Sequence, residues 1–441
     1  VFADYISHIL PELGEENIRE MSFDLFAYRE LKGIVSDCED RYDQIERAVL
    51  LPKSQELCRE KQSAEFAGRL DGYMLGLEDE LMNFRDIEYR GSTLSEKEII
   101  DLFYFKFLDI PLLSRMEAVA EYFIDQVETL RDRDLVDEEK EELLGRFNRM
   151  YETRDCYILY SRFLEQEGYD PLPRVPLEKR KLKFEDVYPI LYLKYSLFRC
   201  KNHHGIKHVV VDEMQDYSRI QYLIIQKLFK CKMTILGDRE QTMDGDQQDV
   251  LTFLPKIFGK DIRRIVMNKS YRNTVEIASY ANKLAGITEV ELFERHGKPV
   301  VQKEFPGLEE ALESVVRELR LEKQAVIAEN ADEGVEDIIS YETAAVIART
   351  ADEARETYYI LKEKLEAEGF DTKERLSLLH RDSTNFQKGL TVTTFYMAKG
   401  LEFDQVFSVF PGEDRSPIVE RARYIAATRA LHELYMYEVV K

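Results

Sequence analysis

The chain has 441 residues, which at roughly 150 residues per domain predicts two to four domains. Hydrophobic residues make up 44% and charged residues 33%, a balance typical of folded globular proteins and not of disordered chains. The net charge is −23, from 62 lysines and arginines against 85 aspartates and glutamates. Because an acidic surface repels phosphate polymers, this charge excludes a general nucleic-acid coat protein, but not a motor with a local basic groove.

Cysteine usage and hydropathy indicate a cytoplasmic protein. The 5 cysteines are isolated, which predicts a reducing compartment without a disulfide framework or a zinc site. No apolar run approaches the ~18 residues of a membrane span, so no membrane contact is expected. The first residues, VFADYISHILPELGEE, lack the basic segment of a signal peptide. They begin on a structured pattern without Met, so we expect further sequence upstream of Val1.

Residues from about 22 to 198 show the periodicity of helices. Ser95 followed by Glu98 predicts a capping box at the start of one of them. In MEAVAEYFIDQVETLRDRD, apolar residues recur every three or four positions, as on the buried face of a helix. The residues of this predicted face are Val119, Phe123, Val127 and Leu130. Strand-like alternation is scarce in this half.

After His208 the pattern changes to short apolar runs separated by helical segments. The runs are HVVVDE, MTILGD, AAVIAR, LTVTTF, QVFSVF and LYMYEVV. Helical periodicity lies between them at Val275–Leu284, Glu309–Leu319 and Ala351–Leu365. Buried strands that alternate with helices predict an α/β fold with parallel sheets covered on both faces.

Two adjacent carboxylates follow the first of these runs. Val209–Val211 ends in Asp212 and Glu213, and ligands bind at the carboxyl ends of strands in open α/β sheets. Since a divalent cation would relieve their repulsion, one carboxylate could hold Mg²⁺ while the other accepts a proton from an attacking water. A solvated acidic turn is the alternative. Gln215 and Asp216 count against it, because they extend the pair to DEMQD.

Two further turns carry residues suited to phosphate. The run Met233–Leu236 ends in Gly237-Asp238, and Gln241 follows three residues later. The string AKGLEFD joins two predicted strands, and its Lys399 and Glu402 offer phosphate and ribose contacts. For each turn taken alone, an ordinary connection between a strand and a helix is the alternative.

Two arginines stand out by their surroundings. Arg272 lies in NKSYRNTVEIA just before a predicted helix, and Arg429 lies in YIAATRALHEL, a stretch that we predict to be helical. A guanidinium group stays charged and can fork onto phosphate oxygens, where it stabilises charge that develops during phosphoryl transfer. For either arginine alone, a salt-bridged surface residue is the alternative.

Taken together, these strings resemble the UvrD/Rep-like superfamily 1 helicases, in which they occur in the same order. They are DEMQD at 212–216, GDREQ at 237–241, SYRN at 270–273, AKGLEFD at 398–404 and AATRA at 426–430, and they span about half of the chain. Three other strings, VFADYISHILPELGEENI, YLKYSLF and LFERHGKPV, are similar to the HelD-like branch, whose ATPases associate with bacterial RNA polymerase.

The resemblance implies a role for each matching residue of the first lobe. Asp212 would coordinate Mg²⁺, Glu213 would activate the hydrolytic water, and Gln241 would sense the γ-phosphate. Asp216 and Asp238, in the same two strings, would belong to the cofactor-binding residues.

The second lobe would contribute the remaining residues of the implied site. Tyr271 would lie near the base of ATP, and Glu402 would contact the ribose. Arg272 and Arg429 would reach the phosphates from across the site.

The chain departs from the family's pattern in three places. It contains no G-x-x-x-x-G-K-[ST] string, so this chain alone should hydrolyse ATP hardly at all. We expect that string upstream of Val1, and a degenerate ATPase is the alternative. Trp is absent, and Tyr396 stands where UvrD-like enzymes often carry a His that faces nucleic acid. These two departures weaken the expectation of processive unwinding.

The resemblance implies an α/β architecture of two RecA-like P-loop NTPase lobes with a long all-helical insertion in the first. Residues 1–30 and 184–265 would form the first lobe, residues 31–183 the insertion, and residues 266–441 the second lobe. ATP would lie between the lobes.

Two functions follow from this architecture. The favoured one is a fragment of an ATP-dependent DNA helicase or translocase of the UvrD/HelD type. Its ligands would be ATP, Mg²⁺ and single-stranded DNA, and it could remodel RNA polymerase complexes. The alternative is a non-catalytic module that binds RNA polymerase and whose ATP site only switches affinity. A nucleotide-free remnant is the third hypothesis.

Overall fold

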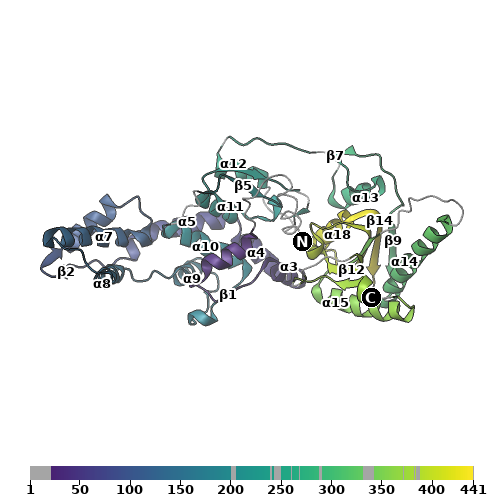
Figure 1. The fold of residues 1–441 in the computed structure, drawn as a ribbon, viewed down its shortest axis with the longest axis horizontal. Coiled ribbons are helices and arrows are strands. Elements are labelled where there is room, and N and C mark those ends of the chain that lie inside the picture. Colours follow the sequence, from purple (N-terminus) through teal and green to yellow (C-terminus); the bar gives the residue numbers. More distant parts are fainter. Residues whose placement is uncertain are drawn as a thin grey trace.

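The computed structural model describes residues 21–199, 205–238, 241–242, 250–259, 261–267, 269–287, 291–330, 342–370, 372–381, 383 and 388–440. The first 20 residues, which we assigned to the first lobe, therefore lie outside the described part. The molecule is elongated, with helices at one end and in the middle and a large sheet at the other end (Figure 1). Within the described residues, no helix has both the length and the apolar character that crossing a membrane requires.

Residues 22–198 are mainly helical, as predicted. The helices are α2 (Phe23–Leu31), α3 (Arg41–Leu50), α4 (Pro52–Lys61), α5 (Ala64–Glu80), α6 (Glu96–Asp101), α7 (Leu112–Arg131), α8 (Asp137–Asn148), α9 (Cys156–Gln166) and α10 (Phe184–Leu197). A π-helical turn at Leu102–Lys106 and a 3₁₀ turn at Leu177–Lys179 lie between them. Four short strands form two pairs, which are β1 (Asp37–Cys38) with β4 (Lys181–Leu182), and β2 (Ile87–Tyr89) with β3 (Ser92–Leu94).

The local predictions for this half are confirmed with one exception. Ser95 and Glu98 form the capping box that begins α6. On α7, Val119, Phe123 and Val127 are buried, but Leu130 is 77% exposed. Leu130 continues the apolar spacing, yet it lies in the last turn of α7, one residue before the helix ends.

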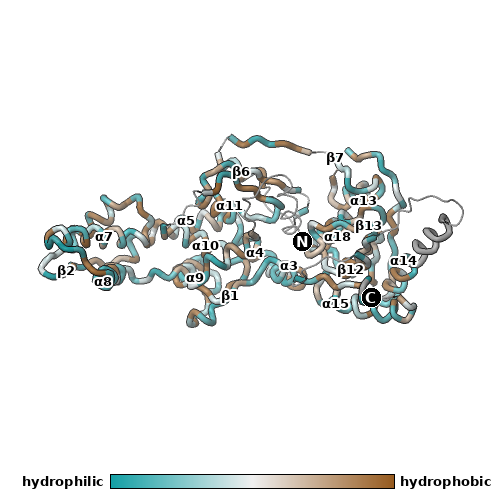
Figure 2. The backbone as a smooth tube through the Cα atoms, in the orientation of Figure 1, coloured by the Kyte–Doolittle hydropathy of each residue, from teal (hydrophilic) through white to brown (hydrophobic). Residues whose placement is uncertain are grey.

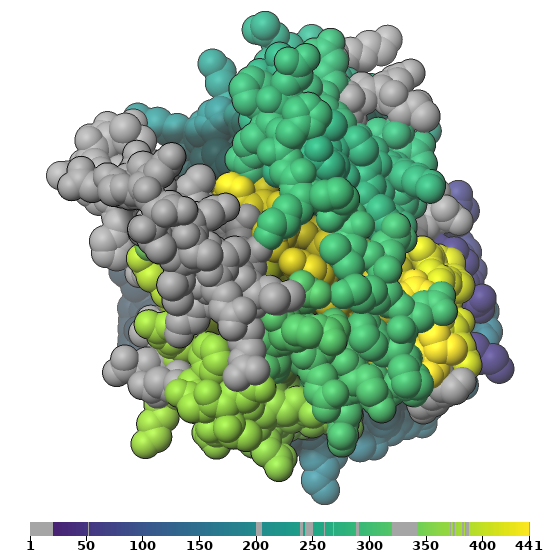
Figure 3. All heavy atoms as spheres, turned by 90° about the vertical axis from the view of Figure 1, so that its right-hand side faces the viewer, coloured from purple at the N-terminus to yellow at the C-terminus, as the bar shows by residue number. Residues whose placement is uncertain are grey.

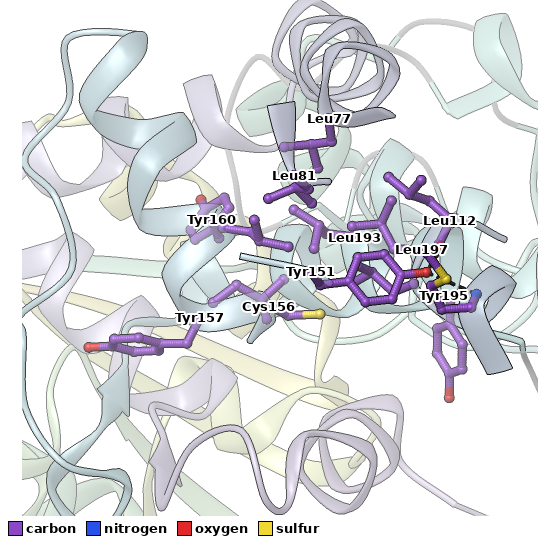
Figure 4. Close-up of a cluster of buried hydrophobic side chains, with 14 of the residues drawn as sticks. Leu77, Leu81, Leu112, Tyr151, Cys156, Tyr157, Tyr160, Leu193, Tyr195 and Leu197 are labelled. Atoms are coloured by element: carbon purple, nitrogen blue, oxygen red, sulfur yellow. Dashed lines mark hydrogen bonds between the residues drawn. The ribbon is translucent and has the colours of Figure 1, made fainter. Parts of the chain in front are cut away.

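The helical half has one continuous apolar core. Side chains from α5, α7, α9 and α10 meet there, together with Tyr151 from the loop before α9 (Figure 4). An ion pair lies in this core, where Lys61 Nζ is 2.6 Å from Asp186 Oδ1 and the hydroxyl of Tyr160 donates to the same oxygen. Because both charged groups are buried and paired, each would be costly to leave alone.

The segment after α10 begins the α/β part. Strands β5 (His208–Val211) and β6 (Lys232–Ile235) pair in parallel, and α11 (Arg219–Leu228) and α12 (Val250–Phe258) pack on one face of the pair. The prediction of a strand buried on both faces is wrong for β5, since Val210 is 62% exposed. The helices cover only the face that carries Val209 and Val211, and Val210 points the other way.

The second α/β part contains a six-stranded parallel sheet in the order β11-β12-β10-β13-β14-β9. Its strands are β9 (Val301–Phe305), β10 (Thr343–Ala348), β11 (Leu376–Leu378), β12 (Gly389–Thr394), β13 (Phe403–Pro411) and β14 (Ala430–Val439). A separate pair consists of β7 (Lys269–Ser270) and β8 (Glu291–Leu292). The helices are α13 (Val275–Ala285), α14 (Leu308–Asn330), α15 (Ala351–Ala367), α16 (Thr372–Arg375), α17 (Phe395–Ala398) and α18 (Pro417–Thr428).

Both faces of this sheet are covered, as predicted for parallel strands. Helices α13, α17 and α18 pack on one face, and α14 and α15 pack on the other. Figure 3 shows this end of the molecule, where green segments from the middle of the chain adjoin yellow atoms of its C-terminal segment. The helical prediction for YIAATRALHEL is wrong in its second half. Helix α18 ends at Thr428, and Ala430 already pairs with Phe403 of β13.

One helix from the N-terminal half belongs to the core of this second sheet. Ile45, Ala48 and Val49 of α3 are buried among side chains of α17 and α18. On the same helix, Glu46 accepts a hydrogen bond of 2.7 Å from the backbone N–H of Ala351, at the start of α15. Helix α3 therefore packs with the second sheet and lies next to it in Figure 2, although 250 or more residues separate them in sequence.

This packing predicts a large effect of truncating Ile45. Ile45→Ala removes buried methyl groups from a well-packed site and should lower the free energy of unfolding by about 2–4 kcal/mol. The control is Leu50→Ala on the same helix, where a side chain that is 58% exposed should change it by less than about 0.5 kcal/mol. Urea denaturation measures both. Equal effects of the two changes would contradict the placement of α3.

Candidate functional site

The acidic turn after β5 has an unusual backbone. Asp212 is exposed, and its Oδ1 accepts a hydrogen bond of 2.9 Å from the N–H of Glu213. Glu213 has φ 52° and ψ 49°, a left-handed conformation that costs a non-glycine residue on the order of 1–3 kcal/mol. The next residue, Met214, is tied to the neighbouring strand end by a 2.8 Å hydrogen bond from its N–H to the carbonyl of Leu236. The ends of the two strands thus fix the position of Glu213, whose backbone is strained.

Gln215 connects the two predicted turns. Its side chain is buried, its Nε2 donates to Glu213 Oε2, and its Oε1 accepts a 3.0 Å hydrogen bond from the N–H of Asp238. Gly237 permits this close approach, because a Cβ there would lie 2.3 Å from Gln215 Oε1 and 2.7 Å from the backbone N of Met214. The sequence drew attention to Gly237 as part of a turn, but the crowding that requires a glycine is visible only in the fold.

Gln241 meets an arginine from the other end of the chain. Its Nε2 donates to Asp238 Oδ2 at 2.8 Å, and its Oε1 accepts from Arg429 Nη2 at 2.9 Å. Arg429 is buried and also donates to the carbonyls of Leu401 and Ile425. Burial, helped by the nearby positive charge of Arg272, lowers the pKa of the Arg429 guanidinium to about 10. Arg429 therefore remains charged at neutral pH.

Lys399 makes the second contact between distant parts of the chain. Its Nζ lies 2.6 Å from Asp216 Oδ2, 3.3 Å from Glu213 Oε2 and 3.1 Å from the carbonyl oxygen of Gln241. Burial raises the pKa of Asp216, while the positive charges of Lys399 and Arg41 act to lower it. The sequence pointed to Lys399 only as a phosphate contact in AKGLEFD. Its carboxylate partners could not be foreseen, because they lie more than 180 residues away.

Two of the remaining predicted residues, Arg272 and Glu402, lie beside this cluster. Arg272 Nε and Glu402 Oε1 form an ion pair at 2.6 Å, and both side chains are close enough to Arg429 to affect its pKa. Tyr271 is 62% exposed, with its ring 5.4 Å from that of Phe293 and Lys269 Nζ 5.6 Å from its centre. The fold thus brings the acidic turns, the two arginines and Glu402 together, and it leaves Tyr271 on the open surface.

The residues present fit a nucleotide-bound Mg²⁺ better than a metal held by protein alone. Among the described residues, no group of three or more His, Cys, Asp or Glu is arranged to hold a metal. Mg²⁺ in nucleotide sites usually takes one or two carboxylates and completes its shell with phosphates and water. Asp212 is exposed at the turn, and Asp216 Oδ1 is buried without a hydrogen-bond partner in the described part of the chain. Both observations are compatible with such a shell.

A family model for the UvrD/REP helicase N-terminal domain matches residues 21–243, just over half of the chain. The chain belongs to the UvrD/REP helicase family. The match covers both acidic strings and ends just after Gln241. No curated protein matches the sequence of this family member.

Solved helicase structures resemble this UvrD/REP family member only distantly. The C-terminal domain of a possible DNA helicase from Lactobacillus plantarum WCFS1 is 23% identical and has a TM-score of 0.27, with 38% of this chain and 88% of that chain covered. The helicase of PRRSV is 12% identical, with 64% and 45% covered and a TM-score of 0.27. An arterivirus nonstructural protein 10 helicase, solved with DNA, is 13% identical, with 64% and 51% covered and a TM-score of 0.27. The chain spans about half the length of these two viral helicases, and the family assignment rests on the family model alone.

The crowding at Gly237 gives a test of the turn geometry. Gly237→Ala places a methyl group against the backbone of Met214 and should lower the free energy of unfolding by about 1–3 kcal/mol. Gly205→Ala is the matched control, since a Cβ at Gly205 would meet no atom of the described residues within 4 Å. Denaturant melts of the two variants compare them directly. A Gly237→Ala protein as stable as the Gly205→Ala protein would show that the turns are not packed this closely.

Proposed function

We propose that the chain is part of an ATP-driven helicase or translocase of the UvrD type, acting on DNA in the cytoplasm. The observation that carries this proposal is the meeting of two segments that are far apart in sequence. Arg429 donates a hydrogen bond to Gln241, and Lys399 forms ion pairs with Glu213 and Asp216. We call residues up to 265 the first half of the chain and residues 266–441 the second half. A site built from both halves can couple the chemistry of a bound nucleotide to relative movement of those halves.

In this proposal each charged group has a task in phosphoryl transfer. Asp212 would hold the Mg²⁺ that neutralises phosphate charge, and Glu213 would accept the proton of the attacking water. Arg272 and Arg429 would stabilise negative charge that develops on the transferred phosphate. In the structure, Arg429 donates a hydrogen bond to Gln241. The proposed sensor of the γ-phosphate, Gln241, is therefore in contact with Arg429, which is proposed to stabilise the charge on that phosphate.

The proposed architecture is a pair of RecA-like lobes, with residues 31–183 as a helical insertion in the first. The six-stranded parallel sheet with both faces covered supports a RecA-like second lobe at 266–441. The parallel pair β5–β6, with α11 and α12 on one face, supports assignment of 184–265 to the first lobe. Helix α3 lies within the proposed insertion 31–183 by sequence, but it packs into the core of the second sheet. The insertion is therefore not separate from the second lobe along its whole length.

Glu213→Gln tests the proposed catalytic role. Removal of the general base should lower the turnover number for ATP in the full-length protein by about 10²-fold or more, while nucleotide affinity stays near that of the wild type. Steady-state hydrolysis and equilibrium nucleotide titration give the two quantities. Glu141→Gln, an exposed position on α8, is the control and should hydrolyse ATP normally. An unchanged turnover number in Glu213→Gln would refute the assignment.

A second candidate function is docking of the helical half on RNA polymerase, with HelD-like proteins as the proposed branch. The observation that favours it is an exposed apolar surface beside the π-helical turn. Phe105 is 76% exposed and Leu108 is 53% exposed, and Phe105 lines a hollow of about 510 Å³. Exposed apolar side chains of this size often mark protein contacts, and π-helical turns are frequent at functional sites.

Point changes test docking better than deletion of residues 31–183, which would remove α3 from the second core. Phe105→Ser together with Leu108→Ser should lower the affinity for purified RNA polymerase by about 10-fold or more, as expected for loss of apolar anchors. Leu75→Ser, an equally exposed position on α5, is the control. Binding is measured by surface plasmon resonance, and an affinity equal to that of the wild type would exclude docking through this surface.

A further inference from the structure

Lys399 is placed to do more than bridge two halves of the molecule. Its side chain is 7% exposed, and its ammonium group contacts two carboxylates and one backbone carbonyl. Three carboxylates, those of Asp212, Glu213 and Asp216, lie within five consecutive residues. A buried cation beside such a cluster offsets their mutual repulsion, and it does so only when the second half is in contact.

Two contacts fall on the same oxygen of Glu213. Gln215 Nε2 donates a hydrogen bond to Oε2, and Lys399 Nζ lies 3.3 Å from that oxygen as an ion pair. Within the described part of the chain, Oε1 of Glu213 accepts no hydrogen bond. The hydrogen bond from Gln215 and the ion pair with Lys399 therefore hold Oε2 and leave Oε1 available to a water molecule, which is the arrangement that a general base needs.

The backbone on both sides of Lys399 is anchored. Before it, Phe395 and Ala398 of α17 are fully buried in the second core, and the ring of Tyr396 lies 5.8 Å from that of Tyr42 on α3. After it, the carbonyl of Leu401 accepts a 3.2 Å hydrogen bond from Arg429 Nη1. Because the segment is held at both ends, movement of the second half moves Lys399 with it.

We propose that Lys399 is a positioning residue for Glu213, which aligns the carboxylate only when the two halves are in contact. This inference rests on the proposed ATPase function, and it adds a residue and a condition to it. Segment 395–401 contacts α3 through Tyr396 and Glu213 through Lys399. A shift of α3 would therefore change the orientation of the carboxylate of the proposed general base. A contact that serves stability alone is the competing explanation.

Kinetics of Lys399 variants in the full-length protein separate the two explanations. Lys399→Met should lower the turnover number for ATP by about 10²-fold, as expected for a misplaced catalytic group, with KM changed by less than about 3-fold. Lys399→Arg keeps the charge and should recover most of the loss. Lys364→Met is the matched control, because it removes the ion pair with Glu313 between α14 and α15 of the second half.

The outcomes also distinguish this inference from the proposed function. If the wild type hydrolyses ATP, Glu213→Gln does not, and Lys399→Met turns over normally, the positioning role is wrong and the ATPase function stands. A loss of stability in Lys399→Met without loss of turnover also overturns it. If Lys399→Met does not fold, Lys399→Gln, which keeps a hydrogen-bond donor without the charge, replaces it and must show the same fall in turnover. If the wild type does not hydrolyse ATP, the proposed function fails and the inference fails with it.

Discussion

The ammonium group of Lys399 lies against the carboxylates of Glu213 and Asp216, and the rest of the site depends on this contact. The acidic turn carries three carboxyl groups within five residues, and a positive partner offsets the repulsion between them. The first half supplies the carboxylates and the second half supplies the cation. Arg429 of the second half also donates a hydrogen bond to the amide oxygen of Gln241 in the first half. Two contacts between the halves therefore lie within one cluster.

Helix α3 sets how the two halves can move. It leaves the helical half, yet Ile45 and Val49 are buried against α17 and α18 of the second sheet. Segment 395–401 therefore touches α3 on one side and the acidic turn on the other. In the proposed motor, closure on a nucleotide cannot occur as a free swing of the second half, because α3 travels with it. Binding of a protein to the helical half could therefore affect the nucleotide site through α3 and segment 395–401.

Much of the fold was predictable from the sequence, because strands and helices have local patterns. The runs ending at Val211 and Leu236 and the capping box at Ser95 were found from neighbouring residues alone. The failures involve tertiary context. Residues 430–433 were predicted to be helical, yet they begin the strand β14, which pairs with β13. Val210 is exposed because α11 and α12 cover only one face of β5. The motif order predicted which residues gather at the site, but the partners of Lys399 required the folded chain.

Hydrogen–deuterium exchange of the full-length protein, with and without ATP and Mg²⁺, tests most directly whether both halves share one nucleotide site. The account predicts that the amides of 212–216, 398–402 and 426–430 become more protected together when nucleotide is added. Protection confined to 212–216, with no change in the two segments of the second half, would contradict it.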